Sequence, residues 1–280
     1  MRPRRARRQH HCVIERDSHG RIFLFAASLL AATSPCFAQD SDHDLAKKLN
    51  NPVASLVSVP LQFNYDCCFK PVGSDRVTLN IQPVMPFGLT RDWNLIVRTI
   101  LPVIAQPSAV AGGHSSFGFG DTNQSFFFSP AGEAGGFIWA IGPAFLWPTA
   151  TEPALGSHKW GAGPTGLLLK QEGGWTVGIL ANHIWSYGGE REYPNVNNTF
   201  LQPFLSYTWP DTTNIGLNTE STYNWTSKQW TVPVNLTVGH LVSLGDQRVN
   251  LTLGGRYYPE RSHDAASWGL RFVMTFLFPK

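Results

Sequence analysis

The last strand-like stretch of the chain, residues 268–278, alternates between two kinds of side chain. Because successive side chains of a strand point to opposite faces, one face of this stretch is wholly apolar and the other carries a charge. A strand that crosses the hydrocarbon core of a bilayer at a tilt needs about 9–11 residues. The pattern therefore predicts a membrane-crossing strand. One face is Trp268, Leu270, Phe272, Met274, Phe276 and Phe278, and the other is Gly269, Arg271, Val273, Thr275 and Leu277.

Similar segments recur along the chain, separated by clusters of Gly, Pro, Asn, Asp and Ser, which is typical of a transmembrane barrel. An even number of strands closes an antiparallel barrel with both termini on the periplasmic side. The ten tryptophans suit an aromatic girdle at the membrane surfaces. The sequence thus predicts an all-β, antiparallel transmembrane β-barrel of about 12 strands, at 53–64, 76–84, 93–103, 118–128, 137–147, 160–170, 175–185, 198–209, 213–225, 230–241, 248–258 and 268–278. A soluble periplasmic β-sandwich is the main alternative fold.

The connections between these segments provide an independent test, because barrels have short periplasmic turns and longer outer loops. The even-numbered connections are short: 85–92, 129–136, 171–174, 210–212 and 242–247. Most odd-numbered connections are longer: 65–75, 104–117, 148–159, 186–197 and 259–267. Only the ninth, 226–229, breaks the rule.

The first 38 residues resemble a secretory signal peptide. An arginine-rich start precedes an apolar stretch at 22–32 and small residues that suit cleavage after Ala38. We expect residues 1–38 to be the signal peptide, 39–52 a periplasmic segment with a short helix at 44–51 capped by Asp44, and 53–280 the barrel. Export of this kind predicts a location in the bacterial outer membrane.

Removal of the signal changes the charge of the protein. Seven of the 22 basic and two of the 19 acidic residues leave with it, so the mature chain carries 15 basic and 17 acidic residues. No basic cluster remains, and we expect no nucleic-acid partner.

The mature chain keeps one adjacent pair of cysteines, Cys67 and Cys68. In an oxidising compartment the pair could form a vicinal disulfide or remain as thiols, and a structural turn is favoured over redox chemistry. His114, His158, His240 and His263 are scattered without the spacing of a metal site. We expect no metal and no cofactor.

Charged side chains of barrel strands should point into the lumen, because an arginine at the lipid midplane costs about 2–4 kcal/mol. Glu220 is the one clear carboxylate predicted among them. Either this basic lining favours anionic or polar solutes, or the arginines pair with Glu220 and fill a narrow barrel. The predicted lumen-lining residues are Arg76, Asn94, Arg98, Asn218, Glu220, Arg248, Arg256 and Arg271.

Catalysis is not expected. Some twelve-stranded outer-membrane barrels are lipid hydrolases with Ser and His at the outer rim, and here His183 precedes Ser186 by three residues. The two have opposite strand parity, so they should face opposite sides and form no catalytic pair. The glycine-rich stretches 118–121 and 161–164 precede strands, so they are not phosphate loops and indicate close backbone approach.

Motifs spread over nearly all of the mature chain resemble a family of bacterial outer-membrane proteins regarded as transporters, sometimes mislabelled "neuromedin U" and related to the MetA-pathway of phenol degradation family. The resemblance implies a porin-like barrel with a suspected transport role, and no catalytic residues. The motifs are DLAKKLNNPVASL at 44–56, NYD at 64–66, LNIQPV at 79–84, WNLI at 93–96, RTILP at 98–102, GFGD at 118–121, PTAT at 148–151, LGS at 155–157, GP at 163–164, ANH at 181–183, QPF at 202–204 and WTVP at 230–233.

We therefore expect a channel or transporter for small solutes, which could be anionic, polar or aromatic. The alternatives are a closed structural or partner-binding barrel and, less favoured, a lipid-modifying enzyme. The expected partners are outer-membrane lipid, a small solute, and the barrel assembly machinery, which would recognise the C-terminal strand.

Overall fold

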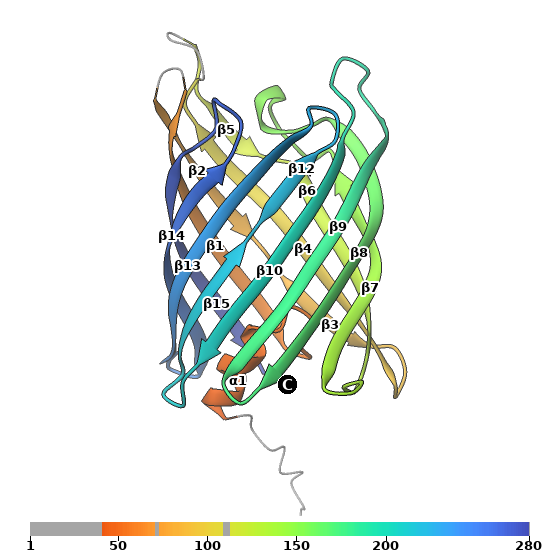
Figure 1. Cartoon of the computed structure of the whole chain (residues 1–280), viewed down its shortest axis with the longest axis vertical. Coiled ribbons are helices and arrows are strands. Elements are labelled where there is room, and N and C mark those ends of the chain that lie inside the picture. The colour runs from red at the N-terminus through yellow and green to blue at the C-terminus, as the bar shows by residue number, and fades with distance from the viewer. Residues whose placement is uncertain (1–40, 71–72, 109–112, 280) are drawn as a thin grey trace, which may run out of the picture. The chain divides into compact units, whose positions relative to one another are not determined.

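A computed structural model describes residues 41–70, 73–108 and 113–279, and the predicted signal peptide lies outside them. The described residues form one antiparallel sheet with two short helices (Figure 1). In chain order the elements are α1 (Asp42–Leu49), β1 (Val57–Phe69), β2 (Ser74–Ile81), β3 (Val84–Gly88), β4 (Trp93–Gln106), β5 (Ser116–Phe119), β6 (Thr122–Pro130), β7 (Phe137–Trp147), the 3-10 helix η1 (Pro153–Leu155), β8 (Lys159–Glu172), β9 (Trp175–Gly189), β10 (Asn197–Thr208), β11 (Thr213–Thr219), β12 (Ser221–Asn224), β13 (Gln229–Leu244), β14 (Gln247–Glu260) and β15 (Trp268–Phe278).

Three of the membrane-crossing strands are interrupted. β2 and β3 both pair with β1 and β4, β5 and β6 both pair with β4, and β11 and β12 both pair with β10 and β13. Pro83, which has no backbone N–H to donate, lies between β2 and β3. β15 pairs with β1 from Phe278 opposite Val57 to Trp268 opposite Cys67, which closes the sheet on itself. The described residues thus form the predicted closed, antiparallel, twelve-stranded barrel.

The two ends of the barrel differ in their connections. At the end where β1 begins and β15 stops, here the terminal end, the turns are 89–92, 131–136, 173–174, 209–212 and 245–246. At the opposite, distal end the connections are 70–73, 107–115, 148–158, 190–196, 225–228 and 261–267. The predicted alternation holds except at the first connection, 70–73, which is short, and the ninth connection is short as expected.

The predicted boundaries of the first strand were wrong. The strand runs over Val57–Phe69 rather than 53–64, so the first connection is short and not the predicted loop 65–75. Asp66 lay in that predicted loop, but Asn64 and Asp66 alternate with Phe63, Tyr65 and Cys67 and belong to the strand. Residues 53–56 instead carry the chain from α1 to the wall.

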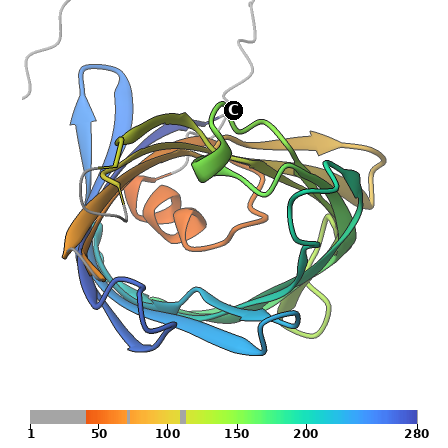
Figure 2. The ribbon, with the colours of Figure 1, turned by 90° about the horizontal axis from the view of Figure 1, so that it is seen from above.

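Helix α1 also differs in its bounds from the predicted 44–51. Its N-cap is Ser41 rather than Asp44, and the Ser41 Oγ accepts a hydrogen bond from the Asp44 N–H at 3.1 Å. Figure 2 shows α1 inside the ring of strands. Leu45 and Ala46 pack there against Ala54, Leu56, Leu241 and Leu277. No helix among the described residues is long and apolar enough to cross a membrane.

Aromatic side chains gather near both ends of the wall. At the terminal end Trp93 contacts Trp139, and Trp175 contacts Tyr207. At the distal end the pairs are Tyr65 with Trp268, Trp147 with Trp160, and Tyr223 with Trp230. This arrangement fits two aromatic girdles at the levels of the membrane surfaces.

Candidate lumen site

The interior of the barrel has two unlike walls. The polar wall is formed by β1, β14 and β15, whose inward side chains include Asn64, Asp66, Arg256 and Arg271, together with Glu220 between β11 and β12. The apolar wall is formed by the parts of β4 and β6–β9 nearest the terminal end, and the segment before β1 adds Val53 to it. Its buried residues are Val53, Ile96, Phe127, Ala140, Leu167, Leu169 and Leu180. Nearer the distal end the same strands carry inward polar residues such as Arg98, Asn123 and Asn182.

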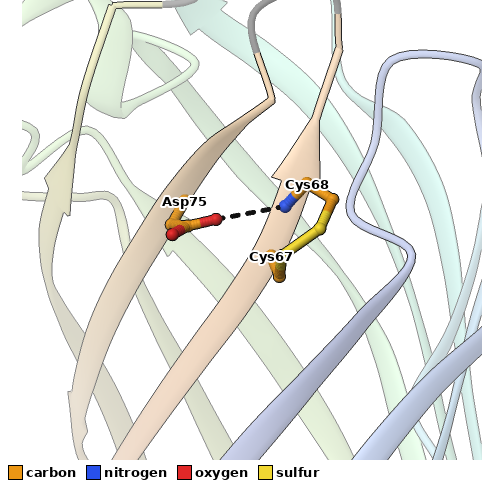
Figure 3. Close-up of side chains that lie close together, drawn as sticks. All are labelled: Cys67, Cys68 and Asp75. Carbon is orange, nitrogen blue, oxygen red and sulfur yellow. Dashed lines mark hydrogen bonds between the residues drawn. A yellow bond between two sulfur atoms is a disulfide. The ribbon is translucent and has the colours of Figure 1, made fainter.

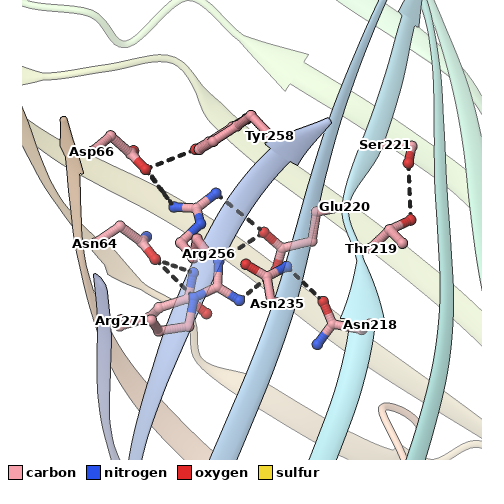
Figure 4. Close-up of polar contacts among 11 residues, drawn as sticks. Asn64, Asp66, Asn218, Thr219, Glu220, Ser221, Asn235, Arg256, Tyr258 and Arg271 are labelled. Atoms are coloured by element: carbon pink, nitrogen blue, oxygen red, sulfur yellow. Dashed lines mark hydrogen bonds and ion pairs between the residues drawn. The ribbon is translucent and has the colours of Figure 1, made fainter. Parts of the chain in front are cut away.

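An ion-pair network on the inner face of the barrel joins β11–β12 to β15, with β13 and β14 between them in the wall (Figure 4). Arg271 donates two hydrogen bonds to Glu220, from Nη1 to Oε1 at 2.8 Å and from Nη2 to Oε2 at 2.7 Å. Such a bidentate pair is among the stronger ionic contacts in proteins. The Arg271 Nε also donates to the Asn64 Oδ1 at 2.8 Å, so the guanidinium is held at both edges. Its side chain is only 4% exposed.

A second pair continues the network toward the distal end. The Arg256 Nη1 lies 3.2 Å from the Asp66 Oδ1, and its Nη2 lies 3.7 Å from the Glu220 Oε2. The Tyr258 hydroxyl donates to the Asp66 Oδ1 at 2.7 Å. The charges of two arginines are therefore matched by those of two carboxylates.

The prediction of Glu220 as the one clear carboxylate among the inward arginines was therefore incomplete. Asp66 had been placed in an outer loop because the first strand was ended too early. The unbroken alternation over residues 57–67 was the signal that could have found it.

The other predicted lumen residues are dispersed. Arg98 donates from Nη2 to the Gln82 Oε1 at 3.1 Å, and the Asn218 Oδ1 accepts from the Asn235 Nδ2 at 2.8 Å. The guanidinium of Arg76 lies over the ring of Phe69, at 4.7 Å from its centroid. Asn94 lies near the start of β4, opposite Gly88 and Ser129 in the register.

Arg248 contacts the N-terminal segment instead of the network. Its Nε donates to the Asp42 Oδ1 of α1 at 2.7 Å. The Asn50 Nδ2 donates to the Thr208 Oγ1 at 2.9 Å, and the Gln171 Nε2 donates to the backbone carbonyl of Lys47 at 3.1 Å. Strands β14, β10 and β8 thus fasten α1 inside the terminal end of the lumen.

Two cavities lie in the lumen, and Arg98 lines both. The first, of about 280 Å³, lies beside the N-terminal segment, where Asn50, Pro52, Gln82, Asn218 and Thr252 also line it. The second, of about 240 Å³, is lined by Asn123, Leu180, Ile184, Asn198 and Phe200 among others. Both have polar and apolar lining, and each is slightly below the usual volume of a drug-sized ligand pocket.

The two cysteines are joined in a vicinal disulfide at the distal end of β1 (Figure 3). The Cys68 N–H donates to the Asp75 Oδ1 at 3.3 Å, and the Tyr65 hydroxyl donates to the Asp75 Oδ2 at 2.6 Å. Cys67, Cys68 and Asp75 are the only metal-like grouping among the described residues. Because the two sulfur atoms are bonded to each other, they are not thiolate ligands.

His183 and Ser186 form hydrogen bonds with different partners. The Ser186 Oγ accepts from the Val196 N–H at 3.0 Å. The His183 Nδ1 shares a hydrogen bond with the Thr199 Oγ1 at 2.7 Å, and its ring lies 4.1 Å from that of Trp185, which faces outward. His183 has the same strand parity as the outward-facing Trp185, whereas Ser186 has the opposite parity, as the sequence analysis expected.

Comparison with known proteins agrees with the fold. No family model matches the chain, and no curated protein matches it. A solved structure, that of the COG4313 outer membrane channel from Pseudomonas putida F1, is similar to 80% of this chain and 96% of that one, with a TM-score of 0.62 and 12% identity. The chain has the fold of an outer-membrane β-barrel.

Outer membrane phospholipase A from Escherichia coli is a weaker match, with a TM-score of 0.49 and 11% identity over 79% of this chain and 96% of that one. At these identities the similarities concern the fold alone. The resemblance to the MetA-pathway family stays a prediction, since no family model matches.

Proposed function

We propose that this barrel is a channel of the bacterial outer membrane for small solutes. The observation that carries the proposal is the pair of lumen cavities on either side of Arg98, within a closed barrel whose outer face is apolar. The structural similarity to a protein described as an outer membrane channel supports it. Assembly into the membrane would proceed through recognition of β15 by the barrel assembly machinery.

The lining favours solutes that are polar at one end and apolar along the rest. Arg256 and Arg271 are matched by Asp66 and Glu220, so their charge is largely neutralised within the wall. Arg98 has a neutral partner, Gln82, and faces both cavities. An anionic or polar group would bind beside Arg98 while an apolar body packs along Leu180 and Phe200.

The N-terminal segment limits passage at the terminal end. Helix α1 lies inside the ring of strands, and the first cavity is lined by the residues that follow it, Asn50 and Pro52. A solute must pass beside this segment, so we expect a small single-channel conductance. This constriction also favours small solutes over large ones.

Planar-bilayer recording of the refolded, full-length mature protein tests the proposal. We expect discrete openings, and we expect Arg98→Gln to lower the preference for anions over cations. Arg91→Gln is the matched control, because Arg91 lies exposed in the turn 89–92. A protein with the heat-modifiable gel mobility of a folded barrel, but with no conductance above background, would contradict a channel.

The second candidate is a closed barrel with a structural or partner-binding role. The ion-pair network and the docked helix favour it, because both occupy part of the interior. If the wild-type protein passes neither ions nor solutes in vesicles, this second function is the one supported.

A further inference from the structure

Two inward-facing glycines, Gly118 in β5 and Gly120 directly after it, leave room for part of the connection 148–158, which we call the mouth loop. In the register of β4 and β5, Gly118 lies opposite Ile104. Ile104 has the same strand parity as Arg98 and Ile100, which line the second cavity. Gly118 therefore faces the lumen.

The mouth loop fills the space that side chains at these glycines would take. A Cβ atom on Gly118 would collide with the Thr151 Oγ1 and lie 3.4 Å from the Leu155 Cδ1. A Cβ atom on Gly120 would lie 3.1 Å from the Leu155 carbonyl oxygen. Leu155 is 6% exposed. The loop therefore packs on the inner face of the wall at the distal end, where Figure 2 shows its short green helix η1.

Backbone and side-chain hydrogen bonds join the loop to β5. The Thr151 N–H donates to the Phe119 carbonyl at 3.1 Å, and the Phe119 N–H donates to the Thr151 Oγ1 at 3.0 Å. The Thr149 hydroxyl donates to the Gly120 carbonyl at 2.8 Å and accepts from the Thr122 N–H at 2.9 Å. The loop thus continues the wall inward rather than projecting freely from the rim.

Asp121, between β5 and β6, holds both ends of the loop. Its Oδ2 accepts from the Ser157 N–H and from the Ser157 hydroxyl, each at 2.6 Å. Its Oδ1 accepts from the Ala150 N–H at 3.3 Å. Hydrogen bonds to a carboxylate are stronger than neutral ones, and one side chain here joins the start of the loop to its end.

We propose that the mouth loop, positioned by Asp121, narrows the distal mouth of the barrel and sets the upper size of the solutes that enter. This inference rests on the proposed channel function. Asp121 is a positioning residue, because it acts through the loop and not by contact with the solute. The position of the mouth loop also explains why the 118–121 motif contains glycines and why small residues occur at 148–157.

Replacement of Asp121 by alanine tests the proposal. In Asp121→Ala the loop loses the contacts that join its ends, and we expect a severalfold rise in single-channel conductance and entry of larger sugars in a liposome-swelling series. Asp121→Asn keeps an acceptor oxygen and should show a smaller rise. Asp92→Ala, at an exposed turn of the terminal end, is the matched control and should behave as wild type.

A cross-link separates loop position from other effects of the substitution. The Cβ built on Gly118 lies 3.4 Å from the Thr151 Cβ, close to the separation of about 3.5–4.5 Å that a disulfide requires. Adding Gly118→Cys and Thr151→Cys to Asp121→Ala should restore wild-type conductance when oxidised and return the higher conductance after a thiol reductant. Asp121→Ala alone, treated with the same reductant, controls for the Cys67–Cys68 disulfide.

Each outcome bears on one claim. If Asp121→Ala conducts no more than a conducting wild type, the proposal that the mouth loop limits entry is overturned, and the channel function is still supported. The same conclusion follows if the oxidised cross-link fails to lower the raised conductance of Asp121→Ala. If the wild type shows no conductance but Asp121→Ala conducts, the mouth loop does block entry and the wild type is a closed barrel. If both folded proteins show no conductance, the channel function and the role of the mouth loop are both overturned.

Discussion

The polar and apolar walls of the lumen are built by the same alternation of side chains, yet they are held together differently. On the polar wall Arg271, Glu220, Arg256 and Asp66 fix one another by directed hydrogen bonds. On the apolar wall Phe127, Leu169 and their neighbours pack without direction. One side of this lumen therefore has a fixed shape, whereas the other can adapt to the molecule that lies against it.

The largest effect is expected from breaking the network. Glu220→Ala leaves Arg271 buried without its carboxylate and should lower the free energy of unfolding by about 3–5 kcal/mol. The measurement is urea unfolding in lipid vesicles, followed by tryptophan fluorescence. Glu172→Ala, which removes the exposed partner of Lys170, is the control and should leave the midpoint unchanged. Equal midpoints for the two variants would contradict a structural role for the network.

A smaller loss is expected on the apolar wall. Leu169→Ala removes a side chain that is 1% exposed and should cost about 2–3 kcal/mol of unfolding free energy. Leu168, its neighbour on β8, is 46% exposed and faces outward, so Leu168→Ala should cost less. The same unfolding experiment compares them. A reversed order would mean that the assigned inner and outer faces are wrong.

Weakening the attachment of α1 to the barrel should change the free energy of unfolding little and the conductance more. Arg248→Ala removes a partly exposed ion pair to Asp42, worth at most about 1 kcal/mol after solvent screening. We expect faster proteolysis of the N-terminal segment and a modest rise in conductance. Lys228→Ala, in a turn at the distal end, is the control. Unchanged cleavage in Arg248→Ala would show that the apolar contacts alone hold the helix.

The smallest expected effect is a pH dependence at the start of α1. The hydrogen bond from the Ser41 hydroxyl lowers the pKa of Asp44 below its ordinary value of 3.8. A lowered pKa means that the charged carboxylate stabilises the helix above that value, and that the contribution is lost as the pH falls through the lowered pKa. Proteolysis by an acid-stable protease should speed up below about pH 4 in the wild type. The change should be weaker in Ser41→Ala, and an identical pH response in both would contradict the cap.

Much of the fold was predictable because lipid demands apolar side chains at every second position. The strand at 268–278 follows from that demand, and most of the connection lengths follow from the separate rule that one end of such a barrel has short turns. The apolar wall was not predicted, because in stretches such as Phe126, Phe127 and Phe128 both faces are apolar and alternation carries no information. Pairing of inward arginines with Glu220 was one of the two alternatives that the sequence left open. Which arginines pair with it could not be predicted, because Arg271 and Arg256 are far from Glu220 in sequence. The mouth loop depends on glycines whose role appears only when Thr151 lies against them.

A comparison of uptake rates for two anions shows whether the two walls of the lumen select the solute together. Benzenesulfonate and gluconate are both monovalent anions of small size, but only the first has an apolar body that could pack against the wall of Leu180 and Phe200. In vesicles containing the full-length protein, the account predicts faster entry of benzenesulfonate than of gluconate, with protein-free vesicles subtracted, and loss of that advantage in Arg98→Gln. Equal rates for the two anions, or an advantage that Arg98→Gln leaves intact, would contradict the claim that the two walls select the solute together.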